Sequence, residues 1–92
     1  MNAEKDEAVK RAQRDLAKRL GVGESEIKVD SVEQKDFPDA ALGAPVDGEM
    51  SAQMITPGQR IRLSVGKDGY EYRASRNSLR LCKFKGGNHR ID

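Results

Sequence analysis

RIRLSVGKDGYEYR, residues 60–73, is the clearest structural signal in the chain. Three aliphatic side chains alternate with polar ones at its start: Ile61, Leu63 and Val65. This two-residue period is typical of a strand with one buried face. The segment GKDG comes next, and its glycines and aspartate tolerate positive φ, which favours a tight turn. The stretch therefore predicts a β-hairpin of residues 60–65 and 70–73.

Two further strands flank this hairpin. After a second turn at SRNS, the segment SLRLCKF (residues 78–84) returns with Leu79 and Leu81 on the inner side. Upstream, IKVDSV alternates apolar and polar residues and predicts a strand over residues 26–32. The tail GGNHRID, residues 86–92, has no such pattern, and we expect it to be flexible.

The N-terminal segment predicts an amphipathic helix over residues 4–20. Four apolar residues recur there at helical spacing: Val9, Ala12, Leu16 and Leu20. Gly21 supplies the left-handed position after the last turn, and Val22 is then placed to fold back in a Schellman motif.

These elements together predict the α+β class, with a single domain over residues 1–85. We expect the N-terminal helix to pack on a three- to four-stranded antiparallel sheet in a two-layer sandwich. A fourth strand would come from AQMI, before a turn at Pro57 and Gly58.

The connector of residues 36–58 is much longer than most loops in small domains. Its apolar residues can pack over the sheet: Phe37, Leu42, Val46, Met50 and Met54. Pro38 and Pro45 stiffen the path, and Asp36 or Asp39 can form an Asx-turn. We therefore expect an ordered, Ω-like loop that completes an undersized core.

Three segments carry a resemblance to a known family: DFPDAALGAP, AQMITPGQRIRL and GYEYRASRNSLRLC. They resemble a small prokaryotic α+β domain with the patterns D-[WF]-P-D-[AS]-S-L-G-C-P, A-Q-x-x-T-P-G-x-x-I-x-L and Y-E-Y-[HR]. The resemblance covers residues 15–82 and implies relatives that are often exported or lipoproteins, with no known activity. Here Ala44 replaces the cysteine of the pattern, so Cys82 lacks the partner that the family would offer.

Charge is divided unevenly along the chain. Residues 1–20 carry 6 basic and 4 acidic side chains, residues 21–58 carry 2 and 8, and residues 59–92 carry 9 and 3. The net charges are therefore +2, −6 and +6, so the acidic middle should attract the basic end before it attracts a ligand.

The residues that catalysis requires are scarce. A nucleophilic triad needs a base near its nucleophile, and the sole imidazole, His89, lies in the glycine-flanked tail, where we expect it to be solvated. Cys82 is interpreted as a structural thiol. The spacings match neither zinc and calcium sites nor a phosphate-binding glycine loop. We therefore expect a protein that is not an enzyme and that binds no metal or cofactor.

We instead expect an unidentified protein or peptide partner that binds the 36–58 connector and the adjoining sheet edge. The candidate contact residues lie in this connector: Phe37, Pro38, Asp39, Leu42, Pro45 and Met50. The alternative is nucleic-acid binding by a basic sheet face made of Arg60, Arg62, Arg73 and Arg80.

The remaining expectations concern location and assembly. The N-terminus has no apolar run behind a basic segment, so we expect neither a signal peptide nor a membrane span. The lone cysteine favours a cytoplasmic location, whereas the resembled family suggests exported relatives. We expect a monomer.

Overall fold

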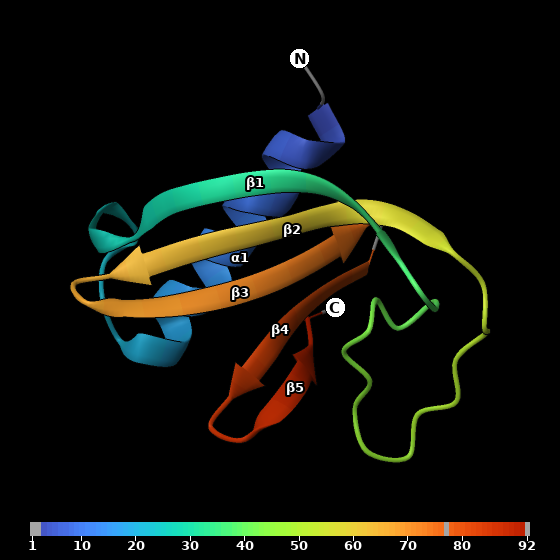
Figure 1. The fold of residues 1–92 in the computed structure, drawn as a ribbon. Helices are drawn as coiled ribbons and strands as arrows, with labels where there is room; N and C mark the ends of the chain where they lie inside the picture. The colour runs from blue at the N-terminus through green and yellow to red at the C-terminus, as the bar shows by residue number, and fades with distance from the viewer. Residues whose placement is uncertain (1–2, 77, 92) are drawn as a thin grey trace.

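The computed structural model describes residues 3–76 and 78–91. Within them an N-terminal helix is followed by an antiparallel five-stranded sheet with strand order β1-β2-β3-β4-β5 (Figure 1). In chain order the elements are α1 (Ala3–Leu20), the 3-10 helix η1 (Glu24–Glu26), β1 (Lys28–Phe37), β2 (Thr56–Val65), β3 (Asp68–Ser75), β4 (Ser78–Phe84) and β5 (Gly87–Arg90). The expected α+β class is confirmed.

The helix α1 matches the predicted periodicity. Ala12 and Leu16 are fully buried at the centre of its apolar face. At its end Gly21 has a φ of 68°, and the Val22 N–H donates to the Ala17 carbonyl at 3.1 Å. This bond is the one that closes a Schellman motif, so the predicted helix end is confirmed.

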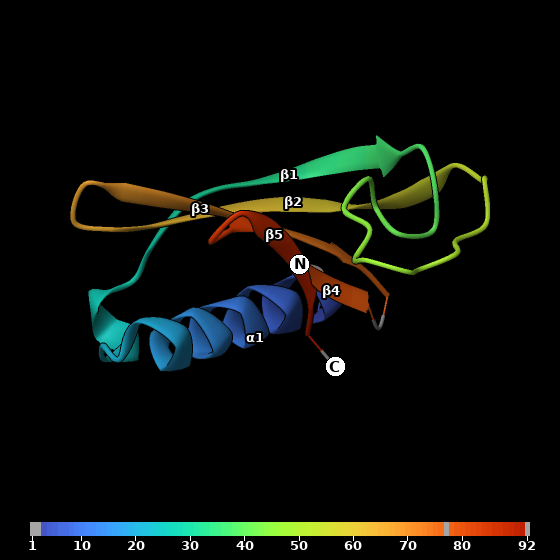
Figure 2. The same ribbon diagram turned by 90° about the horizontal axis from the view of Figure 1, so that it is seen from below.

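The main core lies between α1 and one face of the sheet, and Figure 2 shows the helix running along that face. The sheet contributes five fully buried side chains: Ile61, Leu63, Tyr72, Leu79 and Leu81. The Tyr72 hydroxyl donates to Asp15 Oδ2 at 2.7 Å, and Arg19 Nε contacts the same oxygen at 2.7 Å. This contact ties the sheet to the helix. Burial and the bond to Asp15 raise the pKa of the Tyr72 phenol, so it remains a donor.

The prediction of three or four strands was wrong, because the sheet has a fifth. That strand is β5, and it lies in the segment expected to be a flexible tail. It pairs with β4, with His89 opposite Leu81 and Arg90 opposite Arg80. The Ile91 N–H also donates to the Leu79 carbonyl at 2.9 Å, which extends the ordered chain past the strand.

The two strands that border the connector are longer than predicted. The strand β1 continues to Phe37, and β2 already begins at Thr56, opposite it. Pro57 and Gly58 therefore lie inside β2 instead of forming a turn, and AQMI forms no strand. The connector proper is residues 38–55, called the 38–55 loop below; it lies at the end of the sheet opposite the β2–β3 turn (Figures 1 and 2).

Candidate functional site

The 38–55 loop begins with a turn built on Asp39. The carboxylate oxygen Oδ1 accepts hydrogen bonds from the N–H groups of Ala41 and Gly43, both at 3.0 Å. Leu42 and Gly43 adopt left-handed backbone conformations, with φ of 59° and 67°. An Asp side chain favours such a turn because its carboxylate accepts hydrogen bonds from the backbone N–H groups of the next few residues. The predicted Asx-turn is thus confirmed at Asp39.

This turn presses apolar side chains against the sheet face opposite α1. Phe37, Ala41, Leu42 and Ala44 are each at most 1% exposed. None of them belongs to the cluster between helix and sheet. The Phe37 ring lies close to Gly58 of β2, where an added Cβ atom would come within 3.1 Å of the ring. A second, small apolar core therefore holds the loop, which offsets the limited burial that one helix can provide in a domain of this size.

A row of arginines crosses the same sheet face. Arg60 on β2 pairs with Arg73 on β3, Arg73 with Arg80 on β4, and Arg80 with Arg90 on β5. Arg62, two residues along β2, is exposed on this face. The four predicted arginines thus share a face. Like charges directly opposite one another in a sheet repel, so the row requires acceptors nearby.

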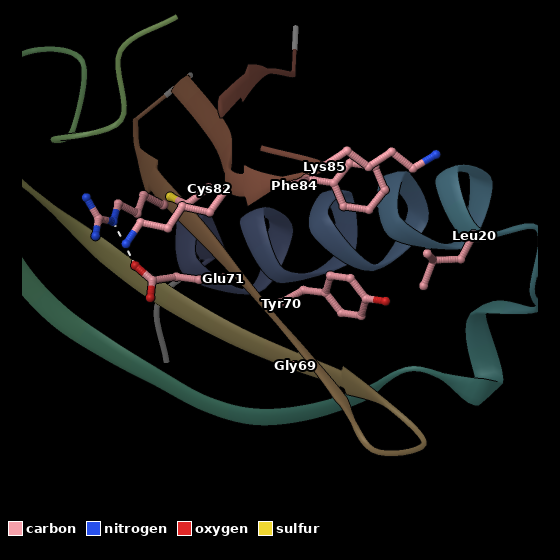
Figure 3. A pocket seen from close by; sticks show the side chains of 9 residues that line it. Leu20, Gly69, Tyr70, Glu71, Cys82, Phe84 and Lys85 are labelled. Atoms are coloured by element: carbon pink, nitrogen blue, oxygen red, sulfur yellow. Dashed lines mark hydrogen bonds and ion pairs between the residues drawn. The ribbon is translucent and has the colours of Figure 1, made fainter. Parts of the chain in front are cut away.

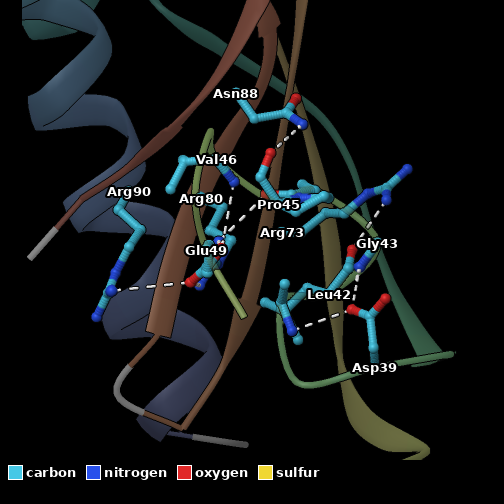
Figure 4. Close-up of polar contacts among 12 residues, drawn as sticks. Asp39, Leu42, Gly43, Pro45, Val46, Glu49, Arg73, Arg80, Asn88 and Arg90 are labelled. Carbon is cyan, nitrogen blue, oxygen red and sulfur yellow. Dashed lines mark hydrogen bonds and ion pairs between the residues drawn. The ribbon is translucent and has the colours of Figure 1, made fainter. Parts of the chain in front are cut away.

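The 38–55 loop supplies two of these acceptors as backbone carbonyls. Arg73 Nη1 donates to the Leu42 carbonyl at 2.9 Å, and Arg80 Nη1 donates to the Ala44 carbonyl at 3.2 Å (Figure 4). Arg73 also binds the Glu71 carboxylate at 2.8 Å. The centre of the arginine row is therefore engaged within the molecule.

Glu49 forms the strongest contact between the loop and the sheet. Its two carboxylate oxygens accept hydrogen bonds from Nη1 and Nη2 of Arg80, each at 2.5 Å, and Arg90 Nη1 lies 3.7 Å away (Figure 4). The Arg80 side chain is only 6% exposed. Hydrogen bonding from Arg80 holds the pKa of Glu49 at about 2, below its ordinary 4.5, although burial opposes this shift. The pair is therefore ionised at neutral pH and clamps the loop.

The predicted contact residues fall into two groups. Phe37 and Leu42 are buried and hold the loop in place, so they cannot touch a partner directly. Pro38 and Pro45 are exposed, and Asp39 is half-buried with its carboxylate committed to the turn. Met50 is 97% exposed and is the member of the set most accessible to a partner.

Sequence reasoning missed several residues of this surface. Glu49 was one of eight acidic residues in the 21–58 segment, and the charge division could not single it out. Asn88 donates from Nδ2 to the Pro45 carbonyl at 3.0 Å, but it lay in the expected tail. The expectation that Met50 and Met54 pack over the sheet was wrong, because they are 97% and 58% exposed, and Ile55 beside Met54 is 72% exposed. No local pattern distinguishes such exposed apolar residues from core residues.

Cys82 and His89, the two residues considered for nucleophilic chemistry, lie on β4 and β5. Burial raises the pKa of the Cys82 thiol, so the reactive thiolate is disfavoured. The His89 ring packs edge-on against Phe84, with centroids 5.8 Å apart, and its Nε2 lies 3.1 Å from the Phe84 carbonyl oxygen.

In the described part of the chain, no three His, Cys, Asp or Glu residues are grouped closely enough to hold a metal ion. None of the described helices is both long and apolar enough to cross a membrane.

Comparisons with known proteins found one family. A family model described as a domain of unknown function (DUF8738) matches residues 9–82, from α1 to β4. No curated protein and no solved structure matches the chain. The matched range is close to the one over which the sequence resembles an uncharacterised small domain; the motif pattern and the exported relatives stay predictions.

Proposed function

The chain belongs to the family of the domain of unknown function DUF8738, so we propose a function from the surface that its own structure presents. The domain acts by contact, without catalysis, and binds an apolar peptide segment of another protein. The contact surface is the second half of the 38–55 loop together with the groove beside it. We call the three exposed apolar residues of this part of the loop, Met50, Met54 and Ile55, the Met-Ile rim.

The observation that carries this proposal is the exposure of three large apolar side chains within six residues. Met50, Met54 and Ile55 are 97%, 58% and 72% exposed. Apolar side chains gathered in solvent on one segment are a common sign of a protein interface. Methionine in addition adapts its shape to different apolar partners.

The rim is held on an anchored backbone. The Ala40 N–H donates to the Ala52 carbonyl at 3.0 Å, which bridges the two halves of the loop. The Thr56 hydroxyl donates to the Met54 carbonyl at 3.0 Å, just before β2 begins. Glu49 is clamped by Arg80 beside Met50. A surface fixed in this way loses little conformational entropy when it docks, which favours binding.

A groove next to the rim gives an extended peptide a place to lie. Met54, Ile55 and Pro57 form its apolar side, and Gln34 and Gln59 offer polar groups to a peptide backbone. Gln34 belongs to β1, which is the outermost strand on that side of the sheet. An open strand edge can pair with a peptide strand while the rim contacts its apolar side chains.

Nucleic-acid binding through the arginine face has less support. Arg73 and Arg80 donate to the loop, and Arg60 contacts Glu33 at 3.2 Å. Arg62 is left as the exposed member of the four predicted residues. The phosphate backbone of a nucleic acid would have to displace the 38–55 loop to reach Arg73 and Arg80 at the centre of the arginine row.

Selection from a random peptide display library tests the proposed function. The wild-type chain should enrich peptides with apolar residues, and a Met50→Ser, Met54→Ser, Ile55→Ser variant should bind them at least about tenfold more weakly, as expected when central contact residues are lost. Fluorescence anisotropy with labelled peptides measures the affinities. Exposed positions contribute little to folding, so the variant should stay within about 0.5 kcal/mol of wild-type stability.

A matched control comes from β1, where Val29 is a 42% exposed apolar residue outside the groove. A Val29→Ser variant should bind the enriched peptides as the wild type does. Equal binding by the wild type and the triple variant would refute the proposal, as would a library from which no peptide is enriched.

A further inference from the structure

A separate cavity opens where β3 and β4 part. The two strands pair from Ser75 opposite Ser78 to Glu71 opposite Cys82, and the pairing stops there. Beyond this point Lys83 takes a left-handed conformation with φ of 51°, and the β4–β5 register shifts between Leu81 and Phe84. The strands therefore diverge and leave a cavity of about 510 Å³ (Figure 3). This volume is within the range of small-molecule sites.

One side of the cavity is aromatic. The rings of Tyr70 and Phe84 approach with centroids 6.2 Å apart and planes tilted by 46°. Leu20, at the end of α1, borders the same side (Figure 3). Both aromatic side chains are half-buried, so part of each is accessible from the cavity. Such a wall suits a flat apolar ring, which stacks on aromatic side chains with little requirement for hydrogen bonds.

The mouth of the cavity is basic. Lys83 and Lys85 flank Phe84, both are exposed, and within residues 3–76 and 78–91 neither forms an ion pair. The acidic lining residue, Glu71, is neutralised by Arg73 at 2.8 Å. The Lys85 Nζ lies 5.5 Å from the centre of the Phe84 ring, which places a positive charge directly beside the aromatic wall.

These features form one recognition site with two parts. A ligand ring would lie against Tyr70 and Phe84, and an anionic group on that ring would reach the two lysines. Both lysines line the cavity. Lys83 lies where the β4–β5 register shifts, with φ of 51°, and Lys85 forms the two-residue turn between β4 and β5 together with Gly86, with φ of 52° and 83°.

We propose that the cavity between β3 and β4 binds a small molecule that combines a flat aromatic ring with a carboxylate or a phosphate. The site is distinct from the groove beside the Met-Ile rim, because the cavity and the groove share no lining residue, and no rim residue lines the cavity. The outcome of a test of the cavity therefore does not bear on the proposed peptide binding.

An NMR titration of the full chain with three matched probes tests the site: 1-naphthoate, the neutral 1-naphthalenemethanol and the cationic 1-naphthalenemethylamine. Naphthoate should cause saturable shifts in the amides of residues 69–71 and 82–85. It should bind about fivefold tighter than the neutral probe, as expected for a charge contact near the surface, and the cationic probe should bind weakest. A parallel titration with adenosine monophosphate distinguishes a phosphate ligand from a carboxylate ligand.

Two variants separate the parts of the site. A Lys83→Gln, Lys85→Gln variant should lose the preference for the anion yet keep the affinity for the neutral ring, whereas Phe84→Leu should weaken both. A Lys10→Gln, Lys28→Gln variant changes two exposed lysines outside the cavity and should behave as wild type. The proposal is overturned if the shifts fail to saturate, if they map elsewhere, or if all three probes bind equally.

Discussion

Gly58 lies where β2 packs closely against the backbone of β3 and the ring of Phe37. A Cβ atom there would lie 2.2 Å from the Ala74 carbonyl oxygen and 3.1 Å from Cε2 of Phe37. Both neighbours are fixed, one as backbone of β3 and the other as a ring that is 1% exposed. The glycine therefore serves close packing inside a strand, although its place after Pro57 favoured a turn in the sequence.

We predict that Gly58→Ala destabilises the domain by roughly 2 kcal/mol or more, because neither neighbour can move without disturbing the sheet or the loop. Urea unfolding followed by circular dichroism measures the loss. Gly69→Ala is the control, since a Cβ at this strand position meets nothing within 4 Å, and it should change stability by less than about 1 kcal/mol. Equal stability of the two variants would contradict the packing seen at Gly58.

Among the elements, β5 shows best why local pattern was insufficient. Its sequence, GNHR, has no apolar alternation. It is held instead by side-chain contacts: the His89 ring lies against Phe84 five positions earlier, and Asn88 bridges the Lys83 N–H and the distant Pro45 carbonyl, each at 3.0 Å. The strand thus connects β4 to the 38–55 loop.

We predict that a chain ending at Lys85 is less stable than the intact chain by about 2 kcal/mol or more, because several hydrogen bonds of about 1 kcal/mol each are lost. The midpoint of urea unfolding measures this difference. In the intact chain, the amide of Ile91, which donates to Leu79, should exchange slowly with solvent. A flexible tail would give the opposite results, with an unchanged midpoint and fast exchange at Ile91.

At the scale of the whole molecule, the uneven charge of the chain becomes a contact between segments. Glu49 belongs to the segment of net charge −6, and its partners Arg80 and Arg90 belong to the segment of net charge +6. Glu33 and Arg60 repeat the pattern at 3.2 Å. The expected attraction between the acidic middle and the basic end is confirmed in these pairs, and it places the loop over the arginine row.

We predict that Glu49→Gln destabilises the domain at neutral pH by about 3 kcal/mol, because Arg80 is left buried without its carboxylate. The pKa of Glu49 is about 2 in the folded chain and ordinarily 4.5, so folding favours the ionised form. This contribution is complete above pH 4.5 and is lost as the pH falls towards 2. Between pH 4.5 and pH 2, the free energy of unfolding should therefore fall less in the variant than in the wild type.

The matched control is Glu33→Gln, since the Glu33 side chain is 49% exposed in its pair with Arg60. An exposed pair contributes at most about 1 kcal/mol, so this variant should retain near wild-type stability. Should both variants lose the same stability, the clamp by Glu49 would not be the contact that holds the loop.

Part of the candidate site was visible in the sequence. The strand period placed Arg60, Arg62, Arg73 and Arg80 on one face, and the composition of the connector indicated an ordered, packed loop. The sequence could not show that this loop lies on those arginines. For that reason it ranked buried Phe37 and Leu42 beside exposed Met50 as contact residues.

Local pattern was enough for α1, the β2–β3 hairpin, β4 and the Asx-turn at Asp39, since periodicity and turn chemistry depend on neighbours a few residues apart. Tertiary structure alone decided β5, the full length of β1, and the choice of Glu49 as partner of Arg80. These features depend on contacts between residues far apart in the chain, 31 positions in the case of Glu49 and Arg80. The free energy of these contacts depends on which polar groups the fold brings together away from water, and local residue spacing does not predict that.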